Sequence, residues 1–337
     1  PATVMLVGAG PELRNHLDEL ATLSQHRSSP SAPAICAVDT ALPTLTSAGI
    51  RPDVVFSLDG QFFNSRDFVP RLPEGVPLCC DLTTYPSVPR LVDRANVFWV
   101  RSSFAPLQAF QEPSPVFASI PSIPALGSVA AMALHLVSGG LPSRGNWPVR
   151  AVCLVGIDFL YRHPEMTHAP MSPAHRLFLT TNTRLNALPR IGATVSRPTI
   201  TTLDRFGATV HADSVLAREA SLLAQTVATA RERGVSVFSV SRLGLEIGTT
   251  VTATVRSTPA WSHVPSRATG NAPNPDTPPA GTGLSPDGAT SNGTAPQDES
   301  YSETEDARQF LLQLRSRLLT QEELLRTSPV PHAHLDA

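Results

Sequence analysis

The sequence predicts an α/β protein with a Rossmann-like fold, an open and mostly parallel sheet flanked by helices. Three observations favour this fold. Short apolar runs alternate with helical patterns along residues 1–256. Three of these runs end in an aspartate, at the edge where parallel sheets of this kind bind ligands. The first run leads directly into Gly8-Ala9-Gly10-Pro11, a turn typical of a strand that is followed by a helix.

The first strand and helix carry the clearest functional signal. Residues 4–7 are apolar and read as a buried strand, and Pro11 suits the first position of a helix. Gly8 and Gly10 permit a tight turn and a close approach of the backbone to a ligand. The helix is indicated by leucines at helical spacing, namely Leu13, Leu17, Leu20 and Leu23. Because a helix start presents free N–H groups to anions, residues 8–12 are predicted to bind a phosphate or nucleotide.

The remaining elements follow from the same patterns. Further strands are expected at residues 34–38, 53–58, 76–82, 96–100, 151–155 and 235–240. A short helix is expected over residues 42–48, a buried helix over 128–138 and a long helix over 213–233. Asp213 is the expected N-cap of the long helix, and Gly234 ends it.

The composition changes after residue 256. Residues 257–301 are rich in Pro, Ser, Thr, Gly and Asn and are expected to be disordered, because they bury too little apolar surface. Ser302 and Glu305 form a capping box, and an amphipathic helix is expected over residues 302–327. That helix would pack on the preceding domain or on a partner.

Composition excludes several function classes. The formal net charge is -2, which gives no field that favours nucleic acid or a membrane surface. The chain has no apolar run long enough for a membrane span and no signal segment, so a cytoplasmic location and four reduced, buried cysteines are expected. All 26 basic residues are arginine, which excludes a P-loop lysine and a Schiff base.

Three acidic residues end predicted strands, namely Asp39, Asp59 and Asp158. Because ligands of open α/β sheets bind beyond the carboxyl ends of the strands, these carboxylates are expected to surround one cleft together with residues 8–12. There they would hold a ribose or a Mg²⁺ ion. The alternative is local capping, since aspartate favours turns.

Three further features are candidates for the same cleft. Gly127 and Ser128 open the buried helix, where Ser128 caps it and the helix N-terminus offers a second anion site. Tyr161 would donate to a departing phosphate oxygen, with packing as the alternative. His211 precedes the long helix and is a candidate general base. The histidines at 163, 168 and 175 fit no standard zinc spacing and mark a loop expected to lie over the cleft.

In this order, these segments resemble the motility-accessory-factor family, whose core is the MptE-like domain, named after the archaeal 6-hydroxymethylpterin diphosphokinase. The segments that carry the resemblance are residues 7–11, 37–45, 52–59, 127–130, 154–159 and 167–169. The resemblance covers about residues 3–250 and also extends to bacterial sialyltransferases that use CMP-sialic acid.

The resemblance implies a glycosyltransferase that attaches nonulosonic, sialic-acid-like sugars to Ser/Thr of flagellin in the cytoplasm. It implies a CMP-activated donor, a sialyltransferase-like core and no required metal, although Mg²⁺ is possible. Tyr161 would assist the leaving phosphate, and His211 would act as the base. The segment of residues 167–169 adds His168 to the candidate binding residues.

The chain departs from the family pattern near the glycine turn. Glu12 stands where a serine is usual, and Ala9 where the sialyltransferases have asparagine. Tyr161 is displaced by one residue, with Leu160 at the expected position.

Two other functions remain open. A pyrophosphokinase acting on a pterin would need ATP and Mg²⁺ and would use Asp39, Asp59 and Asp158 as metal ligands. A non-catalytic core that binds flagellin or a chaperone would use residues 303–326 as its contact.

Overall fold

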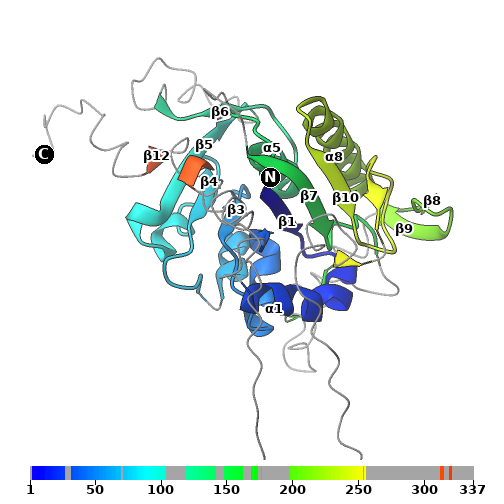
Figure 1. Ribbon diagram of the computed structural model, residues 1–337, viewed down its shortest axis with the longest axis horizontal. Helices are drawn as coiled ribbons and strands as arrows, with labels where there is room; N and C mark the ends of the chain where they lie inside the picture. The colour runs from blue at the N-terminus through cyan, green and yellow to red at the C-terminus, as the bar shows by residue number, and fades with distance from the viewer. Residues whose placement is uncertain are drawn as a thin grey trace, which may run out of the picture.

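The structure is a computed structural model of the 337-residue chain. It describes residues 2–26, 32–69, 71–103, 119–141, 148–161, 168–169, 171–173, 176, 198–252, 254–255, 312–314 and 319–320. A 10-stranded sheet runs through the described part in the order β11-β10-β7-β1-β2-β3-β4-β5-β12, with β6 beside β5 (Figure 1). All pairs in this sheet are parallel except β12 with β5, which confirms the expected α/β fold.

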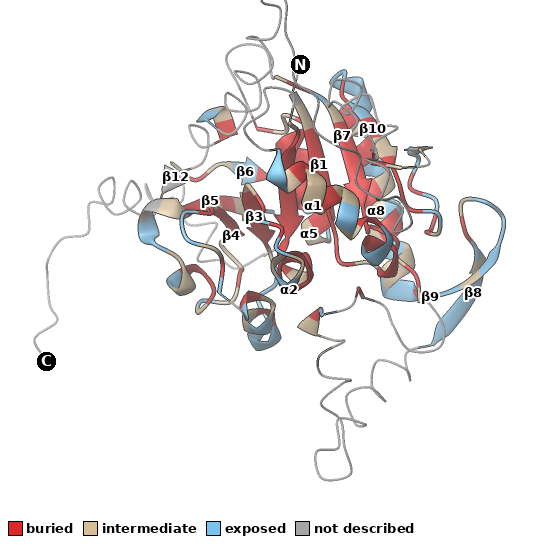
Figure 2. Cartoon of the chain, turned by 60° about the horizontal axis from the view of Figure 1, so that its bottom comes forward, coloured by how far each residue is buried: buried red, intermediate tan, exposed pale blue. Residues whose placement is uncertain are grey.

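The strands form where the sequence is apolar. The strands of the sheet are β1 (Ala2–Val7), β2 (Ala34–Val38), β3 (Val54–Ser57), β4 (Leu78–Asp81), β5 (Val97–Ser102), β6 (Ser122–Ile123), β7 (Val149–Val155), β10 (Ser236–Ser239), β11 (Thr250–Val251) and β12 (Leu319–Thr320). The described residues of β2, β3 and β4 are all buried, as expected for strands covered on both faces (Figure 2). All four cysteines are buried and free, as expected.

Helices cover both faces of the sheet. The main α-helices are α1 (Leu17–Gln25), α2 (Leu42–Ser47), α5 (Val129–Val137) and α8 (Ser214–Glu232). The step from β1 to β2 and the step from β5 to β7 run in opposite directions across the sheet. Right-handed connections therefore place α1 and α2 on one face and α5, with α8 packed beside it, on the other.

The order of the strands reverses between β1 and β7. After β1 the chain adds β2 to β5 on one side, and it then adds β7 and β10 on the other side of β1. The carboxyl ends of these parallel strands share one edge of the sheet. This switch point is where open α/β sheets bind ligands, so the loops after β1 and β7 are the first place to search for a site.

Two regions differ from the sequence prediction. The first helix starts as a 3-10 turn, η1 (Pro11–His16), before α1 begins at Leu17. Residues ahead of the long helix form an unexpected antiparallel hairpin of β8 (Thr199–Leu203) and β9 (Thr209–Asp213). Most residues of β8 are exposed, so they lack the alternation of apolar and polar residues that indicates a half-buried strand.

The C-terminal segment also differs. Residues 312–314 are helical, but Leu319 and Thr320 form β12, which pairs antiparallel with Trp99 and Phe98 of β5. An unbroken helix over residues 302–327 is therefore wrong at this position. β12 pairs with backbone groups that β5 would otherwise leave open at the sheet edge. The linker predicted at residues 257–301 lies outside the described residues.

Within the described part of the chain, no helix combines the length and the apolar character needed to cross a membrane.

Candidate functional site

The glycine turn after β1 packs directly against the turn after β7. The Gly8 N–H donates to the carbonyl of Val155 at 2.8 Å, and the Gly10 N–H donates to the carbonyl of Gly156 at 2.6 Å. A Cβ added at Gly8 would lie 2.6 Å from the Gly156 oxygen, and one at Gly10 would lie 2.7 Å from the same oxygen. The glycines therefore allow two turns to touch, which is a packing role that the sequence did not separate from ligand binding.

Asp158 binds the start of the first helix. Its Oδ2 accepts the Glu12 N–H at 2.8 Å, and the Leu13 N–H is bonded to the Gly10 carbonyl at 3.0 Å. With the N–H groups of Gly8 and Gly10 also bonded, the prediction that the 8–12 turn offers free donors to a phosphate is wrong for these residues. The anion at this helix start is a carboxylate of the protein itself.

Burial controls the ionisation of Asp158. The side chain is 1% exposed, and desolvation raises the pKa of its carboxyl to about 6. The Ser241 hydroxyl and the Glu12 N–H favour the ionised form, whereas the Glu12 carboxylate opposes it and the Arg205 guanidinium favours it. Asp158 thus belongs to a group made by the loops after β1, β7, β8 and β10.

A second polar group lies beyond the ends of β2 and β3. Asp39 is 2% exposed, its Oδ1 accepts the Thr40 N–H at 2.9 Å, and its Oδ2 accepts an Asn64 Nδ2 hydrogen at 3.1 Å. Asn64 Nδ2 also lies 3.1 Å from Ser57 Oγ and 3.0 Å from the Asp59 carbonyl. Burial raises the pKa of Asp39 to about 6, the hydrogen bonds of Ser57, Thr40 and Asn64 oppose this, and Asp59 adds to it.

A third carboxylate joins this second group. Burial, followed by the charges of Asp39 and Asp59, raises the pKa of Asp67 to about 8, and Arg176 opposes that shift. The neighbours that shift the pKa of Asp158 are different ones. The structure therefore brings Asp39 and Asp59 together but gives Asp158 a separate environment, which corrects the expectation of one ring of three aspartates.

The sequence missed Asn64 and Asp67. Both lie on η3 (Phe62–Phe68), a 3-10 helix that the sequence did not predict. An Asn and an Asp after an expected strand end are ordinary loop residues in sequence, so only their contact with Asp39 singles them out.

The donors do not fit a magnesium site. Both oxygens of Asp39 accept hydrogen bonds, and Asp59 Oδ1 accepts the Gln61 N–H at 2.9 Å. Among the described residues, no group of His, Cys, Asp and Glu is arranged to hold a metal ion.

The segment around His168 lies along the same edge of the sheet. The Ala169 N–H donates to the Ala9 carbonyl at 2.7 Å, and Arg176 Nη2 donates to the Arg66 carbonyl at 3.2 Å. Ala169 therefore contacts the glycine turn, and Arg176 contacts η3. Desolvation lowers the pKa of His168 to about 4, so its imidazole is neutral at pH 7. His163 and His175 lie outside the described residues.

Tyr161 and His211 are neighbours in space. The Tyr161 N–H donates to the His211 carbonyl at 2.8 Å, and the two residues form an antiparallel bridge. Residues paired directly across such a bridge project to the same face, as does Asp213 two positions after His211. The Tyr161 hydroxyl donates to Asp213 Oδ2 at 2.6 Å, and Asp213 Oδ1 caps α8 by accepting the Leu216 N–H at 2.8 Å.

The predicted cap of the buried helix is confirmed. Ser128 Oγ accepts the Ala131 N–H at 3.2 Å. Gly127 has a φ of 77°, and a Cβ there would strike the side chain of Leu222 on α8. Because α5 leads back to the amino end of β7, its N-terminus lies at the carboxyl edge of the sheet, as expected. Packing and capping account for both residues.

Comparisons with known proteins agree with this fold. Residues 1–163 match the family model described as 6-hydroxymethylpterin diphosphokinase MptE-like. The chain is similar to the solved structure of the MAf glycosyltransferase from Magnetospirillum magneticum AMB-1, with a TM-score of 0.56 and 15% sequence identity. That match covers 97% of this chain and 39% of the other, so the chain spans well under half of that protein.

No curated protein sequence matches the chain. At 15% identity the structural likeness shows a shared fold, and the family model adds a similarity in sequence over residues 1–163. Both agree with the resemblance found in the order of the motifs. Residues 1–163, a little under half of the chain, are therefore similar to the MptE-like family.

Proposed function

We propose that this chain carries the core of an inverting glycosyltransferase, which moves a nonulosonic sugar from a CMP-activated donor to Ser/Thr hydroxyls of flagellin. The observation that carries the proposal is the contact between Tyr161 and His211, which are separated by 50 positions but lie opposite each other beyond β7. A phenol and an exposed imidazole on one face supply the two groups that the transfer needs.

His211 and Tyr161 would have complementary roles in the transfer. His211 takes the proton of the acceptor hydroxyl as its oxygen bonds to the anomeric carbon of the sugar. The bond from that carbon to the phosphate oxygen breaks, and CMP leaves with the electron pair. Tyr161 donates a hydrogen bond to the departing phosphate, for which its hydroxyl turns away from Asp213. No metal takes part in these steps.

We place the ribose of CMP near Asp59 rather than on free N–H groups of the glycine turn. Asp59 is exposed, and because Oδ1 accepts the Gln61 N–H, Oδ2 is the oxygen offered to a ribose hydroxyl. Gly8, Gly10 and Pro11 then shape the floor of the site. The neutral His168, held beside this turn, would contact the donor.

A transfer assay tests the proposal. The protein would be incubated with a CMP-activated nonulosonic acid and flagellin, and the intact mass of flagellin would be measured. His211→Ala should lower the rate roughly a hundredfold or more, as expected for the loss of a general base. His26→Ala, which removes an exposed histidine at the end of α1, is the matched control and should leave the rate unchanged.

A wild-type rate in the His211→Ala protein would remove His211 from this role. Tight binding of flagellin with no nucleotide binding would favour a non-catalytic accessory protein instead.

The description of the matched family supports a second candidate, a pyrophosphokinase that acts on 6-hydroxymethylpterin. The donors of Asp39 and Asp59 do not fit the Mg²⁺ ion that this reaction requires, and Asp158 lies in a separate environment. The ligand that stabilises the protein against unfolding distinguishes the two functions. Stabilisation by CMP without metal supports the transferase, whereas stabilisation by ATP only when Mg²⁺ is present supports the kinase.

A further inference from the structure

A polar cavity lies beside the start of the first helix. Its volume is about 360 Å³, within the range of about 300–1,000 Å³ typical of small-molecule sites. The described residues that line it are all polar or charged: Glu12, Asn15, His16, Glu19, Arg242 and Thr254. The described lining therefore offers hydrogen bonds and charges to an occupant.

Four of these residues form one face of the first helix. Glu12, Asn15, His16 and Glu19 are spaced three and four positions apart, which places them on a common side. Glu12 is 2% exposed and His16 is 6% exposed. The first helix therefore places buried polar groups, and not only apolar ones, against the cavity.

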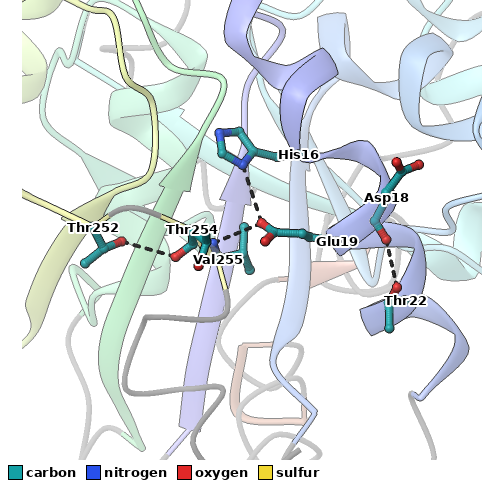
Figure 3. A network of polar contacts seen from close by, with 7 residues as sticks. All are labelled: His16, Asp18, Glu19, Thr22, Thr252, Thr254 and Val255. Carbon is teal, nitrogen blue, oxygen red and sulfur yellow. Dashed lines mark hydrogen bonds and ion pairs between the residues drawn. The ribbon is translucent and has the colours of Figure 1, made fainter. Parts of the chain in front are cut away.

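His16 has one ring nitrogen engaged and one unpaired. Its Nδ1 lies 3.5 Å from Glu19 Oε2, which also accepts the Val255 N–H at 3.0 Å (Figure 3). Its Nε2 is buried and has no hydrogen-bond partner in the part of the chain that the structure describes. The contact of Nδ1 with Glu19 therefore helps to hold the Glu19 carboxylate beside the cavity.

The charges divide along the cavity. Glu12 and Glu19 give it an acidic inner end, and Arg242, which is exposed and forms no ion pair within the described residues, gives it a basic rim. A metal is not the occupant, because no described group of ligating side chains is arranged to hold one.

We propose that this cavity binds a small zwitterionic molecule of about the size of an amino-sugar phosphate. Its ammonium group lies against Glu12 and Glu19, its hydroxyls meet Asn15 and Thr254, and its anionic group lies on Arg242. This assignment does not rest on the proposed transfer reaction, since none of these residues takes part in it.

Three probes test the two charges separately. Glucosamine 6-phosphate carries both, glucose 6-phosphate lacks the ammonium group, and glucosamine lacks the phosphate. Titration calorimetry on the full chain should show the tightest binding for glucosamine 6-phosphate, with roughly tenfold or greater loss for each of the other two. No binding of glucosamine 6-phosphate at millimolar concentration overturns the proposal, as does equal binding of all three.

Variants then locate the site. Glu19→Gln keeps an oxygen that can accept the Val255 N–H, and it should remove the preference for glucosamine 6-phosphate over glucose 6-phosphate. Arg242→Gln should remove the preference for glucosamine 6-phosphate over glucosamine. The matched controls are Asp18→Asn and Arg218→Gln, which remove exposed charges that do not line the cavity (Figure 3 shows Asp18 directed away from Glu19). Unchanged preferences in both cavity variants contradict the assignment.

Discussion

Asp158 and Asp39 look alike in sequence but differ in what they do. Each follows a buried strand, each is almost fully buried, and burial raises the pKa of each to about 6. Asp158 joins two turns by accepting the Glu12 N–H across 146 positions. Asp39 instead belongs to a group of carboxylates and an amide, with Asp59, Asp67 and Asn64.

The two aspartates therefore mark two kinds of site, one that packs two turns together and one whose charged groups suit a ligand. On the β1–β7 side, glycines and Asp158 bring the two turns into contact and use up the donors of the helix start. On the β2–β3 side, like charges are kept close together, which costs stability and is typical of functional groups. An aspartate at a strand end therefore indicates a location at the carboxyl edge and does not by itself indicate a role.

The largest effect is expected from adding a side-chain atom between the turns that follow β1 and β7. Gly10→Ala would put a Cβ 2.7 Å from the Gly156 carbonyl oxygen and against the Asp158 carboxylate. We expect a loss of about 3–5 kcal/mol in the free energy of unfolding, measured by urea denaturation. Gly49→Ala is the control, because it carries the backbone cost of φ 70°, which Gly10 at φ -64° lacks, but has no atom within 4 Å of the added Cβ, and it should lose about 1 kcal/mol. Similar losses in both variants would contradict a closed β1–β7 side.

Both buried aspartates should make the stability of the protein depend on pH. A carboxyl whose pKa is raised from 3.8 to about 6 by folding binds its proton more tightly in the folded state. The stabilisation that the protonated carboxyl gives the folded state is fully present below about pH 4. It is lost as the pH rises through about 6, which lowers the free energy of unfolding by about 3 kcal/mol for each group. Asp158→Asn and Asp39→Asn each remove one titrating group, so in each variant the free energy of unfolding should fall less between about pH 4 and 6.

Only the β2–β3 side should respond at higher pH. Asp67 has a pKa of about 8, raised by burial and then by Asp39, so stability falls further between about pH 6 and 8. Asp39→Asn removes that neighbouring charge and should reduce this second fall, whereas Asp158→Asn should leave it unchanged. Urea denaturation at several pH values measures both slopes, and identical slopes above pH 6 in the two variants would show that the two groups are not separate.

The smallest effect is expected where the β7 turn meets α8. Tyr161→Phe removes the hydroxyl that donates to Asp213 at 2.6 Å, and it should cost about 1–2 kcal/mol of stability. Asp213→Ala also removes the helix cap and should cost more. A double-mutant cycle measures the coupling, and a coupling energy near zero would mean that this bond does not hold the two elements together.

The parts of the structure that depend on local chemistry were predictable from the sequence. The long helix begins after Asp213 and the buried helix after Ser128, each with the cap that the sequence indicated, because capping involves residues three positions apart. Apolar runs identified the main strands of the sheet, because a strand buried on both faces must be apolar along its length. Hairpin β8–β9 was missed because β8 is largely exposed and β9 is only partly buried, so neither strand has an apolar run.

The sequence by itself determined the α/β class, the glycine turn after the first strand and the placement of acidic residues at the strand ends. Only the tertiary structure decided that Asp158 binds Glu12, that Asp39 meets Asn64 and Asp67, and that Tyr161 lies opposite His211. The physical reason is that these contacts depend on the order of the strands in the sheet. That order is set by packing between residues that are distant in the chain, and no local pattern of residues specifies it.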